Sequence, residues 1–462
     1  MTEGPKKGIV SSIRLAHNPM ENVYTVIADR AYQLKSTDSI EVGDAVEIKG
    51  QRAHLAEGKP GSGECDASVK ALEQKVDLAG NAAMINLKDK PYGDAARAMM
   101  PGMQEAATTL INGFISGVPI SVRFHNDGDG SAGAIALYRA FSALEQMFYG
   151  EERRVSWQMN RGIGYTLESF RVDRMLFESY RSAGKPIVVI TDFGTSPESE
   201  EAIGASEGKC DLIWFDHHVT YPGFPKGLIK HYMNVLDFGG ESDFTAGLLT
   251  CIFSELLCGR HMHDLEEASL VSDYSRYADF KNQKAVRDAL ILDFLTSRDD
   301  GYSKPRQMDA ILTDKTKSAD TFMRASATLE EAMDAGIRNI RNHKTKSGTN
   351  ICVLDFGHIA KLNLDYPLPG RYSSKLQDRM ESLHGGRTIT IVHYGSYISI
   401  RVSRDISDSV NLLALIGELK DMSGGSISGG GHKQAASIKT AKEEMGNTMR
   451  LLLIKLGARP DE

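Results

Sequence analysis

The feature that most constrains the fold is a series of short apolar runs separated by stretches of helical character. Residues 186–190 and 212–215 are continuous apolar runs, as expected for strands buried on both faces of a parallel sheet. Residues 120–124 alternate like a strand, with Val122 and Phe124 on one face. Helical stretches separate the runs, at roughly 131–148, 164–183 and 197–206. This alternation predicts an α/β fold with an open, mostly parallel sheet.

Each predicted strand ends in residues that bind hard cations. Ligands of open α/β sheets bind beyond the carboxyl ends of the strands, so these endings are expected to meet at one edge. Carboxylate oxygens and imidazole nitrogens together suit Mn²⁺ or Mg²⁺ better than a thiolate-binding metal. Three independent endings of this kind therefore predict a metal site. They are His125, Asp127 and Asp129 after the first run, Asp192 after the second, and Asp216, His217 and His218 at the third.

The first ending, His-Asn-Asp-Gly-Asp-Gly at residues 125–130, joins a strand to a helix. Asp127 and Asp129 are two residues apart, which in extended chain places both side chains on one side. Gly128 and Gly130 would let the backbone turn tightly around a cation. Taken alone, such a cluster also fits a plain turn, and the other two strand endings favour the metal site.

Composition limits the class of protein. The chain has 462 residues, which predicts two to four domains, and its 41% hydrophobic and 25% charged residues are typical of a soluble globular protein. The net charge of −7 excludes a generally basic nucleic-acid coat but allows a basic channel. No apolar run approaches the roughly 18 residues of a membrane span, and no signal peptide is expected. Five scattered cysteines without a C-x-x-C pair argue against a zinc finger and fit a reducing cytoplasm.

The N-terminal region is β-rich. The runs at 9–15, 23–28 and 45–49 predict a small barrel of the oligonucleotide-binding (OB-like) kind. A β cap without a ligand is the alternative, since only Tyr24 and Tyr32 offer stacking faces. A glycine-rich linker and helices are expected to follow. The linker is residues 58–64, and the helical signals are Val69, Leu72 and Val76 at helical spacing and the stretch 103–116.

A second α/β domain is predicted near the C-terminus, with strands at 350–355, 388–392 and 397–402. It is expected to end in a glycine-rich loop at 424–432 and a helical tail. The polar stretch 303–325 is expected to carry the connection between lobes. The predicted organisation is 1–58 (β module), 59–118 (linker and helices), 119–302 (catalytic domain), 303–348 (inter-lobe connection) and 349–462 (substrate-binding domain).

These motifs, in this order, resemble those of the DHH phosphoesterase superfamily and, more closely, the archaeal RecJ-like single-strand exonucleases. The residues that carry the resemblance are 125–130, Thr191-Asp192, Asp216-His217-His218 and, in the DHH-associated domain, Gly429-Gly-Gly-His432. Supporting stretches are 245–247, 272–275 and 366–370. The chain departs from the family pattern at Gly128, where alanine is usual, and it lacks the cysteine-rich zinc module of some members. The fourth acidic motif fits Asp273 best, with Asp279 as a nearby alternative.

The resemblance implies a two-lobed phosphoesterase with two divalent cations, Mn²⁺ or Mg²⁺, about 3.5–4 Å apart. A water between the cations would supply the attacking hydroxide. His218 would face the scissile phosphate and Asp216 would orient a histidine, and the less favoured alternative for His218 is a structural partner of a backbone carbonyl. The implied ligands of the first cation are His125, Asp127 and Asp192, and those of the second are Asp129, Asp192, His217 and Asp273.

The resemblance also implies that the C-terminal domain grips phosphate. Arg401 matches the family's phosphate-binding arginine, whose fork suits a phosphate, although an exposed strand arginine without a ligand is the alternative. A glycine-rich loop would let backbone N–H groups approach a phosphate, although such loops are often plain turns. The implied phosphate-binding residues are Arg401, Ser403, Gly429, Gly430, Gly431 and His432.

Three functions compete. The first is a metal-dependent exonuclease on single-stranded DNA or RNA, which the extra β module and the length of the chain favour. The second is a small-molecule phosphoesterase acting on dinucleotides, cyclic dinucleotides or pyrophosphate. The third is a replication factor that binds a partner such as the archaeal GINS complex, with nuclease activity secondary. The polarity of degradation and the choice between DNA and RNA stay open at this stage.

Overall fold

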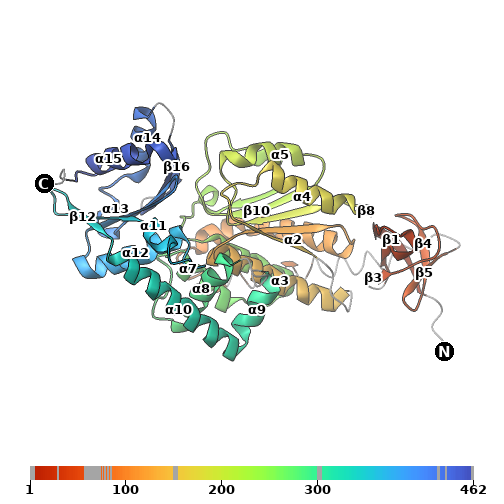
Figure 1. Ribbon diagram of the computed structural model, residues 1–462. Helices are drawn as coiled ribbons and strands as arrows, with labels where there is room; N and C mark the ends of the chain where they lie inside the picture. The colour runs from red at the N-terminus through yellow and green to blue at the C-terminus, as the bar shows by residue number, and fades with distance from the viewer. Residues whose placement is uncertain are drawn as a thin grey trace. The chain divides into compact units, whose positions relative to one another are not determined.

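The structure is a computed structural model, and the chain divides into two compact units (Figure 1). Unit 1 comprises Met1–Leu292 with Asp299–Lys315, and unit 2 comprises Asp293–Arg298 with Thr316–Glu462. The predicted linker at 58–64, Val69, Leu72, residues 424–426 and His432 lie outside the described residues. The structure describes residues 6–28, 31–56, 74, 76–77, 80, 83, 86–148, 155–298, 304–423, 427–431 and 434–458.

Unit 1 is built around a five-stranded sheet in the order β11-β10-β9-β6-β7, in which every pair of neighbours is parallel. The predicted α/β fold with a mostly parallel sheet is therefore confirmed. The two edge strands, β7 and β11, were not predicted, because their outer positions leave them partly exposed and less apolar. The strands are β6 (Ile120–His125), β7 (Ser156–Asn160), β9 (Ile187–Thr191), β10 (Asp211–Asp216) and β11 (His231–Asn234).

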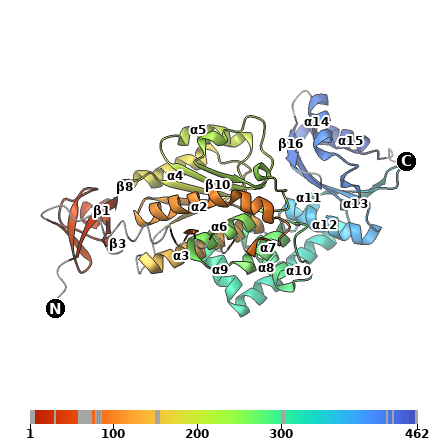
Figure 2. The same ribbon diagram turned by 180° about the vertical axis from the view of Figure 1, so that it is seen from behind.

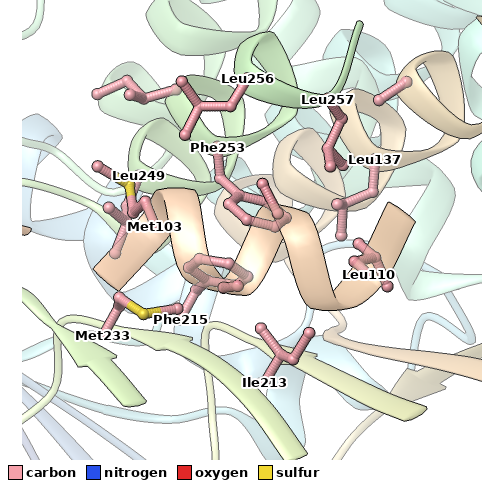
Figure 3. Close-up of a cluster of buried hydrophobic side chains, with 14 of the residues drawn as sticks. Met103, Leu110, Leu137, Ile213, Phe215, Met233, Leu249, Phe253, Leu256 and Leu257 are labelled. Carbon is pink, nitrogen blue, oxygen red and sulfur yellow. The ribbon is translucent and has the colours of Figure 1, made fainter. Parts of the chain in front are cut away.

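Alternate residues of the central strands enter two separate cores, one on each face of the sheet. Val189 and Phe215 pack with α2 (Gly93–Ile115), α3 (Gly128–Phe148) and α6 (Ala246–Cys258). Figure 3 shows part of this core, with Phe215 and Ile213 of β10 beneath α2 and Phe253 of α6. Such two-sided burial is what the continuous apolar runs predicted.

The opposite face of the sheet carries a second core. Val188, Ile190 and Trp214 pack there with α4 (Leu167–Glu178) and α5 (Glu200–Ser206). Figure 1 and the reverse view in Figure 2 both show α4 and α5 on one side of the strands and α2 on the other. The central strands are thus held between helical layers, and their carboxyl ends are left for polar residues.

The strand order places those carboxyl ends at a point where the direction of winding changes. From β6 the chain passes through α3 to β7 on one side, whereas β9, β10 and β11 follow on the other side. Ligand sites of open α/β sheets form at such switch points. The three strands with predicted metal-ligating endings, β6, β9 and β10, are consecutive neighbours in the sheet.

Further helices of unit 1 pack around α3, the helix that follows β6. Helix α3 packs against α6, against α7 (His263–Ser272) and against α9 (Pro305–Thr313). Helix α8 (Gln283–Ser297) begins in unit 1 and ends in unit 2. None of the described helices has the combination of length and apolar character that a membrane span requires.

The N-terminal module is an antiparallel sheet in the order β3-β2-β1-β4-β5, and a parallel bridge between Lys35 and Arg52 joins its two ends into a ring. This closure agrees with the predicted small OB-like β module. Strands β3 and β5 were not predicted because each has only four residues. The strands are β1 (Lys6–Arg14), β2 (Val23–Ile27), β3 (Ala31–Leu34), β4 (Ala45–Lys49) and β5 (Arg52–Leu55).

One predicted helix was too long. The stretch 164–183 was expected to be helical, but α4 ends at Glu178 and Tyr180–Ser182 form the short strand β8, which pairs with β1. Backbone hydrogen bonds from Leu15 to Ser179 and from Ala183 to Ser11 flank this pairing. Pairing with β1, which is remote in sequence, overrides the local helical pattern. The same pairing attaches the N-terminal module to the central domain, which is the part of unit 1 that holds the five-stranded parallel sheet.

Unit 2 contains a six-stranded sheet in the order β12-β13-β14-β15-β17-β16, in which only β13 and β14 are parallel. The predicted smaller α/β domain is therefore present. Its strands are β12 (Arg341–Lys344), β13 (Asn350–Asp355), β14 (Thr388–Tyr394), β15 (Tyr397–Val402), β16 (Ser428–Gly431) and β17 (Ala435–Lys439). Its helices are α10 (Lys315–Ile337), α11 (Gly357–Ala360), α12 (Pro369–His384), α13 (Arg404–Ser407), α14 (Leu412–Met422) and α15 (Met445–Lys455).

The glycine-rich stretch of unit 2 was expected to be a loop, and this was wrong for its described central part. Gly429, Gly430 and Gly431 belong to β16, an edge strand paired with β17. A β-carbon on Gly429 or Gly431 would collide with backbone atoms of β17, whereas one on Gly430 would meet open space. Close strand packing therefore explains two of these glycines, and sequence composition alone could not distinguish such a strand from a turn.

Candidate metal centre

The first strand ending departs from its predicted local geometry. Helix α3 begins at Gly128, directly after Asp127, so Asp129 lies in a helical turn and not in extended chain. Asp127 acts as the helix cap, because its Oδ1 accepts the backbone N–H of Gly130 at 3.0 Å. A β-carbon on Gly130 would collide with the backbone of His125. Close approach of the helix to the strand end, and not a turn around a cation, requires this glycine.

His125 and Asp127 nevertheless converge with Asp192. The Nδ1 atom of His125 lies 2.7 Å from Oδ2 of Asp127 and 3.8 Å from Oδ2 of Asp192. One ligand-type atom from each of the three residues lies within 4.8 Å of the others. These residues form the first predicted ligand set, and the structure brings all of them together.

Asp129 is buried to 1% exposure beside this group. Its Oδ1 accepts the backbone N–H of Gly247 at 3.1 Å and the hydroxyl of Ser269. These two donors come from α6 and α7 and fix the orientation of the carboxylate. Its Oδ2 is left facing His217, whose Nε2 lies 4.0 Å away.

Asp192 follows β9 directly and has a left-handed backbone conformation, with φ of 69°. Its N–H donates to the carbonyl of Phe215 on the neighbouring strand at 2.9 Å, which holds this conformation in place. Aspartate is among the few residues other than glycine that adopt it at low cost. The side chain is 2% exposed and approaches both His125 and His217, so it lies between the two predicted ligand sets.

The ring of His217 is oriented by the protein. Its Nδ1 lies 2.6 Å from the carbonyl oxygen of Ser242, and because a carbonyl only accepts, Nδ1 carries the proton. Nε2 is then free to act as a ligand and lies 3.4 Å from Oδ1 of Asp192. Metal-binding histidines characteristically donate their second ring N–H to such a carbonyl.

Asp216 and His218 form a hydrogen-bonded pair next to this group, and one ligand-type atom of His218 lies within 4.8 Å of ligand-type atoms of Asp192 and His217. Oδ1 of Asp216 accepts Nδ1–H of His218 at 2.7 Å and the backbone N–H groups of His217 at 2.8 Å and of His218 at 3.1 Å. Asp216 is fully buried, whereas the His218 side chain is 51% exposed. The pair therefore presents Nε2 of His218 on the surface beside the buried carboxylates.

The two alternatives for the fourth acidic motif occupy different places. Asp273 directly follows α7 as its C-cap residue, and its Oδ2 lies 3.9 Å from Nδ1 of His217. Asp279 instead accepts the backbone N–H of Lys281 at 3.0 Å in a following turn. The structure therefore brings Asp273, and not Asp279, to the group formed by Asp129, Asp192 and His217.

The buried carboxylates of this centre lie close enough together to raise one another's pKa, and His217 only partly offsets this for Asp129. Burial raises the pKa of Asp129 to about 6, and repulsion from Asp273 and Asp127 adds to the effect. Burial and the neighbouring Asp127 and Asp129 raise the pKa of Asp192 well above its ordinary value. The pKa of Asp216 is lowered instead, because its bonds to the two histidines outweigh the effect of burial.

A divalent cation fits this arrangement. At this centre the Oδ2 atoms of Asp129, Asp192 and Asp216 are buried and have no hydrogen-bond partner within the described part of the chain. Buried carboxylate oxygens are normally paired or coordinate metals, because their desolvation is costly. The donor set of carboxylates and imidazoles suits Mn²⁺ or Mg²⁺.

The raised pKa of Asp129 predicts an unusual pH dependence. Because the raised pKa of Asp129 makes the metal-free native state bind the extra proton, stability should fall as pH rises from about 4 to beyond about 6. The loss attributable to Asp129 is on the order of 3 kcal/mol. Urea unfolding in chelator at about pH 5 and about pH 7.5 measures the part of this loss, roughly half, that falls between those two pH values. The Asp129→Asn variant should lose less stability over this interval, and Mn²⁺ should restore the wild type; equal pH dependence of the two proteins would contradict the prediction.

The residues implied in phosphate binding lie in unit 2. Arg401 is half-buried on β15, in register with Thr390 and Ala435. Ser403 is 2% exposed, and its hydroxyl accepts the backbone N–H of Thr388 at 2.9 Å. Gly429, Gly430 and Gly431 are exposed on β16, and His432 lies outside the described residues. A phosphate-binding role for this group remains a prediction.

Sequence reasoning missed three groups that hold the centre. They are the carbonyl of Ser242, the N–H of Gly247 and the hydroxyl of Ser269. A β-carbon on Gly247 would collide with Asp129, so this glycine is required by close approach. Gly247 belonged to a stretch noted for its resemblance, but no sequence signal pointed to Ser242 or Ser269.

Comparisons with known proteins agree with this architecture. No protein-family model matches the chain. It is 22% identical to the uncharacterized protein MJ1198 of Methanocaldococcus jannaschii over 88% of this chain and 61% of that protein. A DHH domain described as a member of the s1p family of ribosomal proteins superposes with a TM-score of 0.68 at 18% identity, over 86% of this chain and 99% of that chain.

RecJ of Thermus thermophilus in complex with Mn²⁺ superposes with a TM-score of 0.51 at 16% identity, over 86% of this chain and 61% of RecJ. The chain thus spans less than two thirds of the length of RecJ and of MJ1198. At these identities the likeness concerns the fold.

Proposed function

We propose, from the DHH-domain fold that this chain shares with RecJ-like proteins, that it is a metal-dependent phosphodiesterase acting as an exonuclease on single-stranded nucleic acid. The observation that carries the proposal is the cluster of buried, unpartnered carboxylate oxygens of Asp129 and Asp192 beside an exposed, oriented His218. The unpartnered carboxylate oxygens call for cations, and His218 offers a hydrogen-bond donor to a substrate.

The proposed ligands divide into two overlapping groups around Asp192. His125 and Asp127 would complete one group, and Asp129, His217 and Asp273 the other. Bound Mn²⁺ or Mg²⁺ would supply Lewis acidity and a nucleophile at neutral pH. The protein fixes the ligands in advance, through the Ser242 carbonyl on His217 and the Gly247 and Ser269 donors on Asp129.

His218 is the proposed catalytic donor. Its Nδ1–H is held by Asp216, so Nε2 points away from that carboxylate and is available at the surface. In the protonated form Nε2 can donate to a phosphate oxygen as negative charge develops there. Asp216 is a positioning residue, because it touches His218 and not the substrate.

A polymeric substrate is favoured by the N-terminal module. This OB-like ring of strands is attached to the central domain through β8 and through the hydroxyl of Ser12, which donates to the carbonyl of Gly117 at 2.8 Å. A small-molecule phosphoesterase has no evident need for such a module. In unit 2, Arg401 and the exposed backbone of β16 are the proposed contacts to the phosphates of the strand.

The proposal predicts metal-dependent shortening of single-stranded oligonucleotides labelled at either end. Wild-type protein should shorten them with Mn²⁺ or Mg²⁺ but not with chelator, and the label lost first gives the polarity. His218→Ala should lower kcat about 10²–10³-fold, as expected for removal of one donor to a developing charge. His384→Ala, which removes an exposed histidine of unit 2, is the matched control and should retain activity.

Other outcomes would redirect the proposal. Turnover of a dinucleotide or cyclic dinucleotide, with intact oligonucleotides, would show a small-molecule phosphoesterase. Inactivity on both substrates with every metal would leave a scaffold role, for example in binding a replication partner such as GINS. Equal activity of His218→Ala and wild type would refute the role given to His218.

A further inference from the structure

A second cluster of histidine and glutamate lies at the turn between α6 and α7, and the proposed nuclease chemistry does not use it. Helix α6 ends at Cys258, Gly259 adopts a left-handed conformation, and α7 begins at His263. One ligand-type atom each of His261, His263 and Glu266 lies within 4.8 Å of the others. The sequence signal is a His-x-His pair followed three residues later by glutamate, a spacing that places His263 and Glu266 on one helical face.

The distances match a shared cation better than direct hydrogen bonds. Nε2 of His261 lies 3.5 Å from Oε2 of Glu266, and Nδ1 of His263 lies 3.8 Å from the same oxygen. Two ligands that are each about 2.1 Å from a tetrahedral zinc ion lie roughly 3.4 Å apart. The nitrogen–oxygen distances in this metal-free cluster are therefore already close to those between two ligands of one zinc ion.

His261 also has the supporting contact that zinc-binding histidines use. Its Nδ1 lies 3.1 Å from Oε2 of Glu255, a side chain that is 12% exposed near the end of α6. A carboxylate in this position accepts a hydrogen bond from Nδ1–H, which leaves the Nε2 lone pair for a metal. Nε2 is the atom of His261 that approaches Glu266.

The charges around Glu266 favour the binding of a cation. Glu266 is 7% exposed, which is costly for a carboxylate without a positive partner. The other acid in the first turn of α7, Asp264, is already bound by both terminal nitrogens of Arg139, at 2.9 and 3.0 Å. Lys90 is close enough for its charge to act on Glu266, but Glu255 adds a second carboxylate to the cluster.

We propose that His261, His263 and Glu266 bind one Zn²⁺, with Glu255 orienting His261 and water completing the coordination. Two imidazoles and one carboxylate are a donor set that zinc accepts, whereas Mn²⁺ and Mg²⁺ prefer oxygen-rich sites. The exposed rings of His261 and His263 give the ion access from solvent. The site is distinct from the metal centre and does not depend on the nuclease proposal.

Zinc at this position would fasten the turn that follows α6 to the first turn of α7, and the contact of His261 with Glu255 ties that turn back to α6. Gly247 of α6 and Ser269 of α7 are the two residues that hold Oδ1 of Asp129. The ion would therefore stabilise the pair of helices that supports the metal centre, although no zinc ligand belongs to that centre. Slower hydrogen exchange of the α6 and α7 amides on zinc addition is the expected structural readout.

Zinc titration by calorimetry of the full, chelator-treated protein tests the proposal. The His261→Ala, His263→Ala double variant should bind one zinc equivalent fewer than wild type, because zinc taken up at the metal centre is common to both proteins. Glu255→Gln should keep that equivalent but bind it about 10–100-fold more weakly. The wild type should also gain exchange protection in α6 and α7 on zinc addition, and the double variant should not.

The control variant is His358→Ala, His384→Ala, which removes two exposed histidines from unit 2. It should bind as many zinc equivalents as wild type. An unchanged number and affinity of zinc ions in the His261→Ala, His263→Ala variant would overturn the proposal. Because both of these side chains are exposed, the variant is expected to fold, and a circular dichroism spectrum equal to that of wild type verifies this.

Discussion

Asp192→Asn is expected to abolish metal-dependent hydrolysis while leaving the fold intact. Asparagine tolerates the left-handed backbone conformation that residue 192 adopts, with φ of 69°, so the substitution changes charge with little strain. It removes the carboxylate that approaches both His125 and His217. Because both proposed ligand groups use this residue, activity should fall well beyond the roughly 10–100-fold typical of a supporting residue.

The same substitution should stabilise the metal-free protein. Repulsion from Asp127 and Asp129 contributes to the raised pKa of Asp192, so the neutral side chain removes an unfavourable interaction. Urea unfolding in chelator should give a higher free energy of unfolding for Asp192→Asn than for wild type. Added Mn²⁺ should stabilise the wild type by mass action and the variant far less.

Asp211→Asn is the matched control, because Asp211 begins β10 at the opposite end of the strand and pairs with the half-exposed Lys230. It should retain activity and Mn²⁺ binding. Full activity of Asp192→Asn, or an undiminished response to Mn²⁺, would remove Asp192 from the centre.

The sequence predicted those parts of the fold that local apolarity encodes. Strands β9 and β10 are buried on both faces, and their uninterrupted apolar composition predicted this arrangement. The edge strands β7 and β11 are partly exposed and mixed in composition, so they gave no comparable signal. Strand β8 exists because β1, which is remote in the sequence, pairs with it, and no local pattern can show such a partner.

The residues of the candidate site likewise divide into those that the local sequence predicted and those that depend on parts of the chain remote in sequence. Asp192 and Asp216-His217-His218 could be placed because a residue at the end of a strand has a known position in a parallel sheet. The donors on Asp129 could not, because Gly247 and Ser269 lie 118 and 140 residues further along the chain. The conformation of Asp129 itself was misjudged, since the start of α3 depends on the Asp127 cap and on close packing against His125.

Strand β6 also carries a buried ion pair that the alternating pattern of its sequence did not predict. Arg123 of β6 is 4% exposed, and its Nε donates to Oδ2 of Asp173 on α4 at 2.7 Å. The hydroxyl groups of Ser121 and Tyr165 also donate to Asp173, at 2.7 and 2.8 Å. On the face opposite Val122 and Phe124, β6 thus presents polar yet buried side chains, because one carboxylate satisfies three donors.

Asp173→Ala should therefore destabilise the protein by about 3–5 kcal/mol, because it leaves the Arg123 guanidinium buried without its counter-ion. Urea unfolding of the variant and of wild type measures the loss. Glu168→Ala is the control on the same helix, since Glu168 has a side chain that is 79% exposed and should change stability little.

A double variant separates the loss of the pair from the cost of an unpaired charge. Replacing both partners, as Arg123→Met with Asp173→Leu, should recover much of the stability that Asp173→Ala loses, because apolar side chains leave no buried charge behind. Equal losses in the single and double variants would show instead that the hydrogen bonds from Ser121 and Tyr165 dominate. Since β6 ends at His125, a double variant that folds but binds Mn²⁺ weakly would further show that the ion pair positions the strand end for the metal centre.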